Sequence, residues 1–170
     1  MRLNFSDLKI IKANPNMIKS IEFDCGDDDL NEFLLKDSIK NIKYNLCTLF
    51  LCYYKDNVVG FFSLSADSIK INEKLEINYS AYPAVKIGRL AVSKEFQNLC
   101  IGSFIINWII GFCRKLREEI GIRFISVDAY NNEKTLKFYK NNFFVSFKSN
   151  QEKHRNIPLY RDICEKYNYQ

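Results

Sequence analysis

The sequence has almost none of the residues that build metal sites. Its 170 residues include one histidine, His154, and none of its six cysteines form a Cys-x-x-Cys pair. Zinc sites draw on closely spaced cysteine and histidine ligands, so the common zinc sites are excluded and we predict no bound metal. The cysteine spacing favours free thiols, buried as small apolar residues, in a reducing cytoplasm. The cysteines are Cys25, Cys47, Cys52, Cys100, Cys113 and Cys164.

Long apolar runs are also missing. The longest, FIINWIIGFC from Phe104 to Cys113, is about half as long as a membrane-spanning helix. The amino-terminal stretch MRLNFSDLK has no apolar core of the kind that signal peptides carry. We therefore predict a cytoplasmic protein without a membrane segment.

Glycine and proline are scarce, with six and three residues, and no linker rich in them divides the chain. Hydrophobic residues make up 47% of the sequence and aromatic residues 15%, which is enough to pack a core. At this length we predict one domain, residues 1–170. The net charge of +5 permits attraction to a polyanion but does not require it.

Apolar patterns of strand and helix type alternate along the chain. Acidic residues open the stretch 23–43 and lysines close it, which predicts a helix capped by Asp27 or Asp28. Residues 55–57 are predicted to form a hairpin turn, and Gly121 to end a helix that follows Gly102. The order predicts an α/β fold, a mixed sheet with helices between its strands. The predicted strands cover residues 45–54, 58–71, 84–92, 123–130, 143–147 and 157–164, and a second short helix covers 132–142.

One loop leads from a predicted strand into an apolar helix, within GRLAVSKEFQNLCIGSF (88–104). At the start of such a helix several backbone N–H groups have no partner in the helix and carry partial positive charge. A strand–loop–helix turn of this kind can bind an anion, above all a phosphate. The turn alone is a weak signal, because many α/β proteins have one that binds nothing.

The chain resembles the GNAT N-acetyltransferase superfamily, and the resemblance spans nearly the whole sequence. The family signature, Gln/Arg-x-x-Gly-x-Gly/Ala between a strand and a helix, matches residues 97–102. Two more blocks follow in the expected order, ISVDAYN (125–131) and KTLKFYKNNFF (134–144). The resemblance implies the GNAT fold, a mixed and mostly antiparallel sheet whose parallel central strands splay apart, flanked by α-helices.

Four further stretches resemble the acetyltransferase toxins of bacterial toxin–antitoxin systems. They are FDCG (23–26), LNEFL (30–34), VVGFFSLS (58–65) and GRLAV (88–92). Such toxins acetylate the α-amine of an aminoacyl group on tRNA, which stops its use in translation. The resemblance therefore implies three partners: acetyl-CoA, an aminoacyl-tRNA, and a DNA-binding antitoxin of the ribbon–helix–helix class. The sequence leaves open whether the chain forms a homodimer.

In this family acetyl-CoA lies where two parallel strands splay apart, which here are the strands ending at Val92 and Tyr130. The pantetheine is expected to pair with backbone around Leu90, where an N–H group can polarise the thioester carbonyl. The diphosphate is expected on the amides that follow Gln97. The residues implied for the cofactor are Leu90, Ala91, Val92, Gln97, Asn98, Leu99, Cys100, Ile101, Gly102, Ser103 and Asn131.

Tyr139 aligns with the family's general acid, which protonates the departing thiolate of coenzyme A. A phenol keeps its proton at neutral pH. Because an alkyl thiol is about 1.5 pKa units more acidic, complete transfer costs roughly 2 kcal/mol, and Tyr139 is expected to act mainly as a hydrogen-bond donor. The structural alternative is a tyrosine that only packs a helix against the sheet. No carboxylate is an obvious base, but an α-amine with a pKa of about 8 can lose its proton to water.

Two places depart from the family pattern. Cys100 stands where the family has glycine, and Asn98 and Leu99 stand where the toxins usually have a further glycine and a lysine. If Cys100 is left-handed the cost is about 1–2 kcal/mol, and if its Cβ crowds the phosphates the affinity falls instead. We therefore predict weaker acetyl-CoA binding than in relatives, strengthened by Cys100→Gly. Asn142 is expected to replace the glycine that ends the helix of Tyr139.

Several other residues have both a structural and a functional interpretation. Cys25 has no histidine near it and is expected to be buried rather than nucleophilic, and His154 is expected to be solvated. Arg89 either faces an RNA phosphate, as a substrate-binding residue, or pairs with a carboxylate. A group of basic residues either forms a solvated face or steers tRNA. This group consists of Lys134, Lys137, Lys140, Lys148, Lys153 and Arg155.

Three functions are compatible with the sequence. The leading one is acetyl transfer from acetyl-CoA to an aminoacyl-tRNA. The second keeps the enzyme class but gives it a small-molecule amine or a protein N-terminus as acceptor. The third is a binding partner of an antitoxin or RNA, in which the altered loop no longer supports turnover.

Overall fold

The computed structural model describes residues 3–71, 75, 79–147 and 155–164, and the chain divides into two compact units. Unit 1 comprises residues 1–65 and 88–106, and unit 2 comprises residues 66–87 and 107–170. Each unit has a hydrophobic cluster of its own, around Phe61 in unit 1 and around Phe124 in unit 2. The prediction of one domain stays a prediction.

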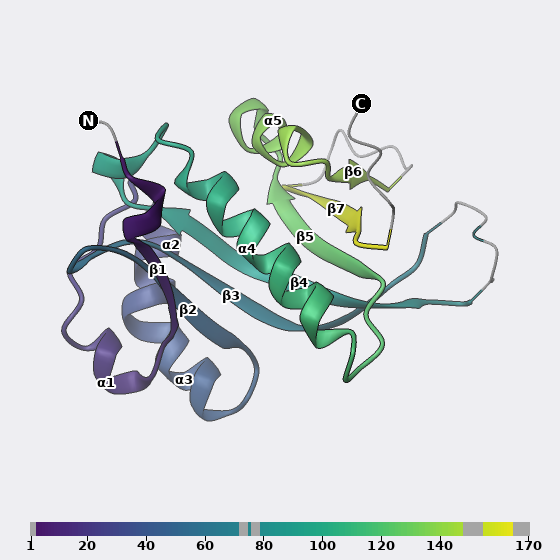
Figure 1. Ribbon diagram of the computed structural model, residues 1–170, viewed down its shortest axis with the longest axis horizontal. Coiled ribbons are helices and arrows are strands. Elements are labelled where there is room, and N and C mark those ends of the chain that lie inside the picture. Colours follow the sequence, from purple (N-terminus) through teal and green to yellow (C-terminus); the bar gives the residue numbers. More distant parts are fainter. Residues whose placement is uncertain (1–2, 72–74, 76–78, 148–154, 165–170) are drawn as a thin grey trace. The chain divides into compact units, whose positions relative to one another are not determined.

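The described residues contain seven strands, which form a sheet in the order β1-β2-β3-β4-β5-β7-β6 (Figure 1). Four of the strand pairs, β1–β2, β2–β3, β5–β7 and β6–β7, are antiparallel. Strands β4 and β5 run parallel, with Ala84 opposite Phe124 and Ile87 opposite Val127. The mixed, mostly antiparallel α/β fold is thereby confirmed, and the splay of β4 from β5 stays a prediction. The strands are β1 (Leu8–Lys12), β2 (Thr48–Tyr54), β3 (Asn57–Ile69), β4 (Tyr82–Val92), β5 (Phe124–Tyr130), β6 (Val145–Ser146) and β7 (Asn156–Asp162).

In unit 1 the stretch 23–43 is helical, as predicted. Asp27 is the N-cap, and its carboxylate accepts a hydrogen bond from the Leu30 N–H at 3.1 Å. Leu34 and Ser38 are fully buried on the inner side of this segment. The sequence missed three short elements before it: the 3-10 turn η1 (Phe5–Asp7), β1 and α1 (Pro15–Ile18). The helical segment consists of α2 (Asp28–Glu32), the π-helical turn η2 (Phe33–Asp37) and α3 (Ser38–Lys43).

The predicted hairpin between β2 and β3 is confirmed. Tyr54 pairs with Asn57, so Lys55 and Asp56 form the turn between the strands. Lys55 is left-handed, with φ 54°.

Helix α4 (Ile101–Leu116) follows β4 and the 3-10 turn η3 (Lys94–Phe96). It begins one residue before Gly102. Gly121 does not end it, and that prediction was wrong. The helix ends at Leu116, after which the N–H groups of Glu118 and Glu119 bond to carbonyls three residues back, Glu118 to Lys115 at 3.2 Å.

In unit 2, helix α5 (Glu133–Asn141) begins at the N-cap Asn132, whose side chain accepts from the Thr135 N–H at 2.8 Å. The left-handed residue after this helix is Phe143, with φ 62°, and not Asn142, whose φ is −97°. The prediction that Asn142 takes the place of the family's glycine was therefore wrong by one residue. The physical reason is the geometry of the helix end, in which the left-handed conformation falls on the second residue after the last helical one.

The hydrogen bonds of this helix end form a Schellman motif. The Phe143 N–H donates to the Lys140 carbonyl at 2.9 Å, and the Phe144 N–H donates to the Tyr139 carbonyl at 3.0 Å. The rings of Phe144 and Tyr139 also pack edge to face, with centroids 5.2 Å apart. The end of α5 thus fixes the backbone and the ring of Tyr139 together.

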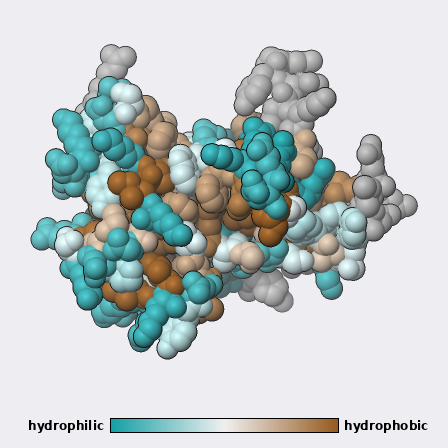
Figure 2. Space-filling model, turned by 60° about the horizontal axis from the view of Figure 1, so that its bottom comes forward, coloured by the Kyte–Doolittle hydropathy of each residue, from teal (hydrophilic) through white to brown (hydrophobic). Residues whose placement is uncertain are grey.

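Some large apolar side chains of unit 1 are exposed, including Tyr44 at 68% and Leu46 at 63%. On the face drawn in Figure 2, brown hydrophobic residues lie in several patches separated by teal hydrophilic residues. Exposed apolar residues dispersed in this way are normal for folded proteins and identify no partner. No helix among the described residues is long and apolar enough to cross a bilayer.

Candidate active site

The loop between β4 and α4 has an unusual backbone. Asn98 and Cys100 are both left-handed, each with φ 61°, whereas Leu99 between them is not. Such alternation turns successive backbone N–H groups toward one side and forms a concave anion-binding arrangement called a nest. The family signature, residues 97–102, therefore has the local geometry expected of a phosphate-binding loop.

The N–H groups of this loop are available to a ligand. Within the described part of the chain, no atom accepts a hydrogen bond from the backbone N–H groups of residues 98–103. The Cys100 carbonyl accepts from the Phe104 N–H at 3.0 Å, which makes Cys100 the N-cap of α4. Cysteine stands here in place of the residues with a side-chain oxygen that usually cap a helix. The positive end of α4 and the nest thus point their donors into the same loop.

The conformation of Cys100 shows the first of the two costs expected for it, backbone strain. Its φ is left-handed, and this backbone conformation costs about 1–2 kcal/mol in a residue that carries a Cβ. Asn98 adopts the same conformation at a lower cost, because asparagine tolerates it. Glycine adopts a left-handed conformation without strain, which explains why the related toxins usually have glycine at these two positions.

The other predicted cofactor residues of unit 1 lie next to this loop. Ile101 is buried, whereas Gly102 and Ser103 are half-buried at the start of α4. Leu90, Ala91 and Val92 form the end of β4, where Ala91 is buried in the core of unit 1. Adjacent backbone is tightly packed, since a Cβ on Gly60 would lie 2.9 Å from the Ala91 carbonyl oxygen.

Arg89 stacks on an aromatic ring. Its guanidinium carbon lies 5.2 Å from the centroid of the Phe33 ring, and its Nη1 donates to the Gly88 carbonyl at 2.8 Å. Its backbone N–H donates to the buried Ser63 hydroxyl at 3.0 Å. None of the described carboxylates pairs with it, so for these residues the carboxylate alternative was wrong. The exposed guanidinium keeps donors for another acceptor.

Tyr139 lies in unit 2 with its ring buried, 6% exposed, between Phe138 and Phe144. Burial raises the pKa of Tyr139, so the phenol holds its proton more firmly than free tyrosine. The hydroxyl has no hydrogen-bond partner among the described residues. Among the described residues the hydroxyl is therefore an unengaged donor on a buried ring.

Asn131 also belongs to unit 2, directly after β5. Its side chain is exposed, and its backbone N–H donates to the Arg155 carbonyl at 2.9 Å. The structure thus brings Leu90–Val92 and the loop 97–103 together in unit 1, and places Asn131 and Tyr139 in unit 2.

The remaining candidates have structural interpretations or lie elsewhere. Cys25 is buried, as predicted, and burial raises the pKa of its thiol, which disfavours the reactive thiolate. No group of described residues has the ligands to hold a metal ion. His154, Lys148 and Lys153 lie outside the described residues. The described members of the basic group are exposed, namely Lys134, Lys137, Lys140 and Arg155.

Sequence reasoning missed Asp24 and Lys94, whose side chains meet beside the loop at 2.7 Å. They are 70 residues apart, so no local spacing could reveal the contact. The available signal was the FDCG stretch itself, which served only as a mark of the toxin family.

Comparison with known proteins identifies the family and the fold. Residues 16–143 match the acetyltransferase (GNAT) family. A tRNA-acetylating toxin of Mycobacterium tuberculosis is 28% identical over 115 residues, which cover 65% of this chain and 69% of that protein. AtaT complexed with acetyl-methionyl-tRNAfMet has a TM-score of 0.77 at 22% identity, covering 92% of this chain and 95% of that one.

A second similar solved structure contains acetyl-CoA and part of an antitoxin. A Tyr-to-Phe mutant of the AtaT toxin, bound to the C-terminus of the antitoxin AtaR and to acetyl-CoA, has a TM-score of 0.73 at 20% identity. It covers 92% of this chain and 94% of that one. The structural likenesses agree with the fold, and the family match extends over more than half of the sequence. The chain belongs to the acetyltransferase (GNAT) family.

Proposed function

We propose that this chain is a toxin that transfers the acetyl group of acetyl-CoA to the α-amine of an aminoacyl-tRNA and thereby blocks translation. The observation that carries the proposal is the loop at the start of α4, where left-handed Asn98 and Cys100 present unpaired N–H groups. In a GNAT-family chain this loop is suited to the diphosphate of coenzyme A. The tRNA-acetylating relative and the AtaT complexes support the acceptor.

Acetyl-CoA supplies the acetyl group as a thioester. We assign its diphosphate to the amides of residues 98–103 and its pantetheine to the backbone of residues 90–92, as an added strand would pair. Backbone N–H groups at the end of β4 then polarise the thioester carbonyl and stabilise the oxyanion that forms during attack. Asn131 contributes a polar contact to the same cofactor.

The reaction needs one nucleophile and one proton donor. The α-ammonium group first loses a proton to water, because its pKa is about 8, and the free amine nitrogen then attacks the carbonyl carbon. As the C–S bond breaks, the attacking nitrogen releases its second proton to water. The sulfur departs as a thiolate, and we assign Tyr139 as the donor to it. Since burial raises the pKa of Tyr139, a hydrogen bond to the thiolate is favoured over complete proton transfer.

Arg89 and the exposed basic residues are assigned to the acceptor. The guanidinium of Arg89, held over the Phe33 ring, is suited to bidentate contact with a phosphate. The lysines of α5 add positive charge that favours capture of a polyanion.

The wider setting belongs to the same proposal. The AtaT structure with its antitoxin supports an antitoxin as the neutralising partner, and we assign it to the ribbon–helix–helix class by the resemblance alone. Six free thiols support a cytoplasmic location. The family match runs through both units, which supports one catalytic domain over residues 1–170. A homodimer is the remaining prediction, and light scattering on the purified protein measures it directly.

Transfer of radiolabelled acetyl from acetyl-CoA to a pool of charged tRNA tests the function. We expect label in the tRNA fraction, released by mild alkali that cleaves the aminoacyl ester, and none on deacylated tRNA. Label on free amino acids, polyamines or protein N-termini instead would favour the second function. Coenzyme A binding without transfer to any amine would favour the third, and growth arrest on expression that Tyr139→Phe relieves would exclude it.

A further inference from the structure

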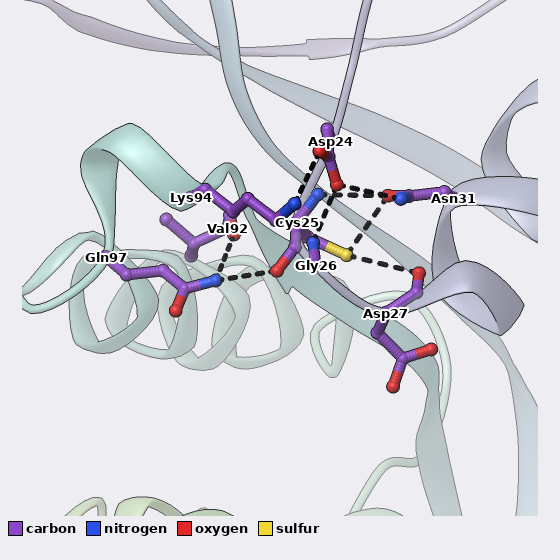
Figure 3. Close-up of polar contacts among 8 residues, drawn as sticks. All are labelled: Asp24, Cys25, Gly26, Asp27, Asn31, Val92, Lys94 and Gln97. Carbon is purple, nitrogen blue, oxygen red and sulfur yellow. Dashed lines mark hydrogen bonds and ion pairs between the residues drawn. The ribbon is translucent and has the colours of Figure 1, made fainter.

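The FDCG stretch (23–26) is hydrogen-bonded to the residues that lead into the loop 97–103, first through Lys94 and then through Gln97 (Figure 3). The Asp24 carboxylate accepts from the Lys94 ammonium group at 2.7 Å, and the Asp24 carbonyl accepts from the Lys94 N–H at 2.9 Å. The hydrogen bond from Lys94 lowers the pKa of Asp24 to about 2, so this pair stays charged over the whole neutral range. Side chain and backbone of Lys94 are therefore both fixed to one residue.

Gln97 makes the second connection. Its side-chain Nε2 donates to the Cys25 carbonyl at 2.8 Å and to the Val92 carbonyl at 3.1 Å (Figure 3). One amide group thus ties three points together: the FDCG stretch, the last residue of β4 and the first residue of the signature loop. The side chain that the signature requires at this position is directed at protein backbone.

The FDCG stretch is itself held rigid by Asn31 of α2. The Asn31 Nδ2 donates to the Asp24 carboxylate at 3.0 Å, and its Oδ1 accepts from the Cys25 N–H at 3.0 Å. Gly26 has φ 83° and its N–H donates to the same carboxylate at 2.8 Å. Glycine suits this position because of its positive φ, and a Cβ there would also lie 2.8 Å from the Lys94 Cε, which the flexible lysine would have to move aside to accommodate.

Folding stability does not explain this arrangement. The Asp24 and Lys94 side chains are 57% and 58% exposed, and exposed ion pairs contribute little to stability. The loop that follows them, however, requires restraint from its surroundings. Left-handed residues persist only when their surroundings over-determine them, and the unpaired N–H groups of residues 98–103 supply no restraint of their own.

We propose that Asp24, Lys94 and Gln97 are positioning residues that fix the entry of the loop, so that its N–H groups are set for the diphosphate of acetyl-CoA. This inference rests on the proposed function and deepens it. It explains why a toxin-type FDCG stretch accompanies a Gln-type signature, because the two are halves of one hydrogen-bonded unit. The three residues act through the loop and need not touch the cofactor.

The test compares two acetyl donors, acetyl-CoA and acetyl-pantetheine, which lacks the diphosphate. We expect Lys94→Met and Gln97→Met to raise the KM for acetyl-CoA roughly five- to tenfold, the range expected when one orienting hydrogen bond is lost, with kcat little changed. The kcat/KM for acetyl-pantetheine should change less than about twofold. Lys94→Arg keeps the ion pair and should restore most of the affinity for acetyl-CoA.

The matched control is Lys36→Met, which breaks another exposed ion pair of unit 1, with Glu32 at 3.0 Å. This variant should have the same kinetic constants as the wild type with both acetyl donors. An equal loss with both donors, accompanied by a lower melting temperature, would overturn the inference in favour of a purely structural role. Unchanged kinetics with acetyl-CoA would also overturn it.

Failure of the proposed function is distinguishable from failure of this inference. If the wild type transfers no acetyl group to any amine, calorimetry with coenzyme A still decides, because the two methionine variants should bind it more weakly than the wild type and Lys36→Met should not. If the wild type does not bind coenzyme A at all, both the proposed function and the inference are wrong.

Discussion

Asn98 and Cys100 share one left-handed backbone conformation, φ 61° each, on the two sides of Leu99. For asparagine this conformation is tolerated, and for glycine it is free of strain, but a cysteine pays for its Cβ. The strain of the loop is therefore concentrated at Cys100. The same residue is the N-cap of α4 and lies at the centre of the unpaired N–H groups.

Cys100→Gly should bind acetyl-CoA more tightly than the wild type. Glycine removes a strain of about 1–2 kcal/mol, offset in part by about 0.5–1 kcal/mol of added chain entropy, and clears a side chain from beside the donors. Titration calorimetry should show a gain of a few-fold in affinity. Asn98→Gly is the matched control and should gain less, because asparagine already tolerates the conformation. Identical affinities of Cys100→Gly and wild type would contradict this prediction.

Tyr139→Phe should lower kcat by about 100-fold, within the range of proton donors in enzymes, and leave the KM for acetyl-CoA nearly unchanged. The variant removes the hydroxyl and keeps the ring, whose contacts with Phe138 and Phe144 account for its packing. Its melting temperature should stay close to that of the wild type. Phe144→Leu serves as the control for ring packing and should affect stability more than Tyr139→Phe does. Full activity of Tyr139→Phe would assign the tyrosine to packing alone.

The elements with local signals were predictable from the sequence, and those fixed by distant contacts were not. Asp27, one of the two predicted caps, marked the start of the helix at residues 28–43 because a cap acts within one turn. The parallel pair β4–β5 was implied by the resemblance to the GNAT family. Strand β1 was missed because only its first residue, Leu8, is buried, so LKIIK shows no alternating pattern.

The candidate site divides in the same way. The signature located the loop, and its missing glycines anticipated a strained Cys100. The left-handed residue after α5 was placed at Asn142 by residue preference, whereas the hydrogen bonds of the helix end put it at Phe143. The link from Asp24 to Lys94 could not be predicted, because two exposed charges 70 residues apart leave no periodic trace.

The rate of acetyl transfer should rise with pH and should not fall again in the pH range where free tyrosine ionises. The α-amine must lose its proton to attack, so kcat/KM for aminoacyl-tRNA should rise up to about pH 8. Burial raises the pKa of Tyr139, so the phenol should stay protonated and the rate should stay level to about pH 10, where a free tyrosine would ionise. Initial rates over short times check this, because the aminoacyl ester hydrolyses in alkali. A fall between about pH 8 and pH 9 that is absent in Tyr139→Phe would contradict it.

Salt should weaken the capture of tRNA far more than the use of acetyl-CoA. Lys137 and Lys140 are exposed on α5, and each phosphate contact contributes a slope of about 0.7–0.9 to the logarithm of affinity against the logarithm of salt. Replacing either lysine with alanine should reduce that slope by up to this amount. Lys43→Ala, an exposed lysine of α3, is the matched control. A KM for tRNA that does not change between about 50 and 200 mM salt would count against tRNA as the acceptor.

Arg89 should not be replaceable by lysine. The guanidinium is held on the Phe33 ring and on the Gly88 carbonyl, and a planar, stacked group that binds phosphate at two points has no equivalent in an ammonium group. Both Arg89→Lys and Arg89→Ala should raise the KM for aminoacyl-tRNA about tenfold, as expected for one lost contact to a charged group. Phe33→Leu removes the ring but keeps the arginine and should fall between these variants and the wild type. This pattern would show that neither the charge nor the stacking of Arg89 is sufficient alone. Wild-type kinetics in Arg89→Lys would instead mean that only the positive charge matters, and would contradict a bidentate phosphate contact.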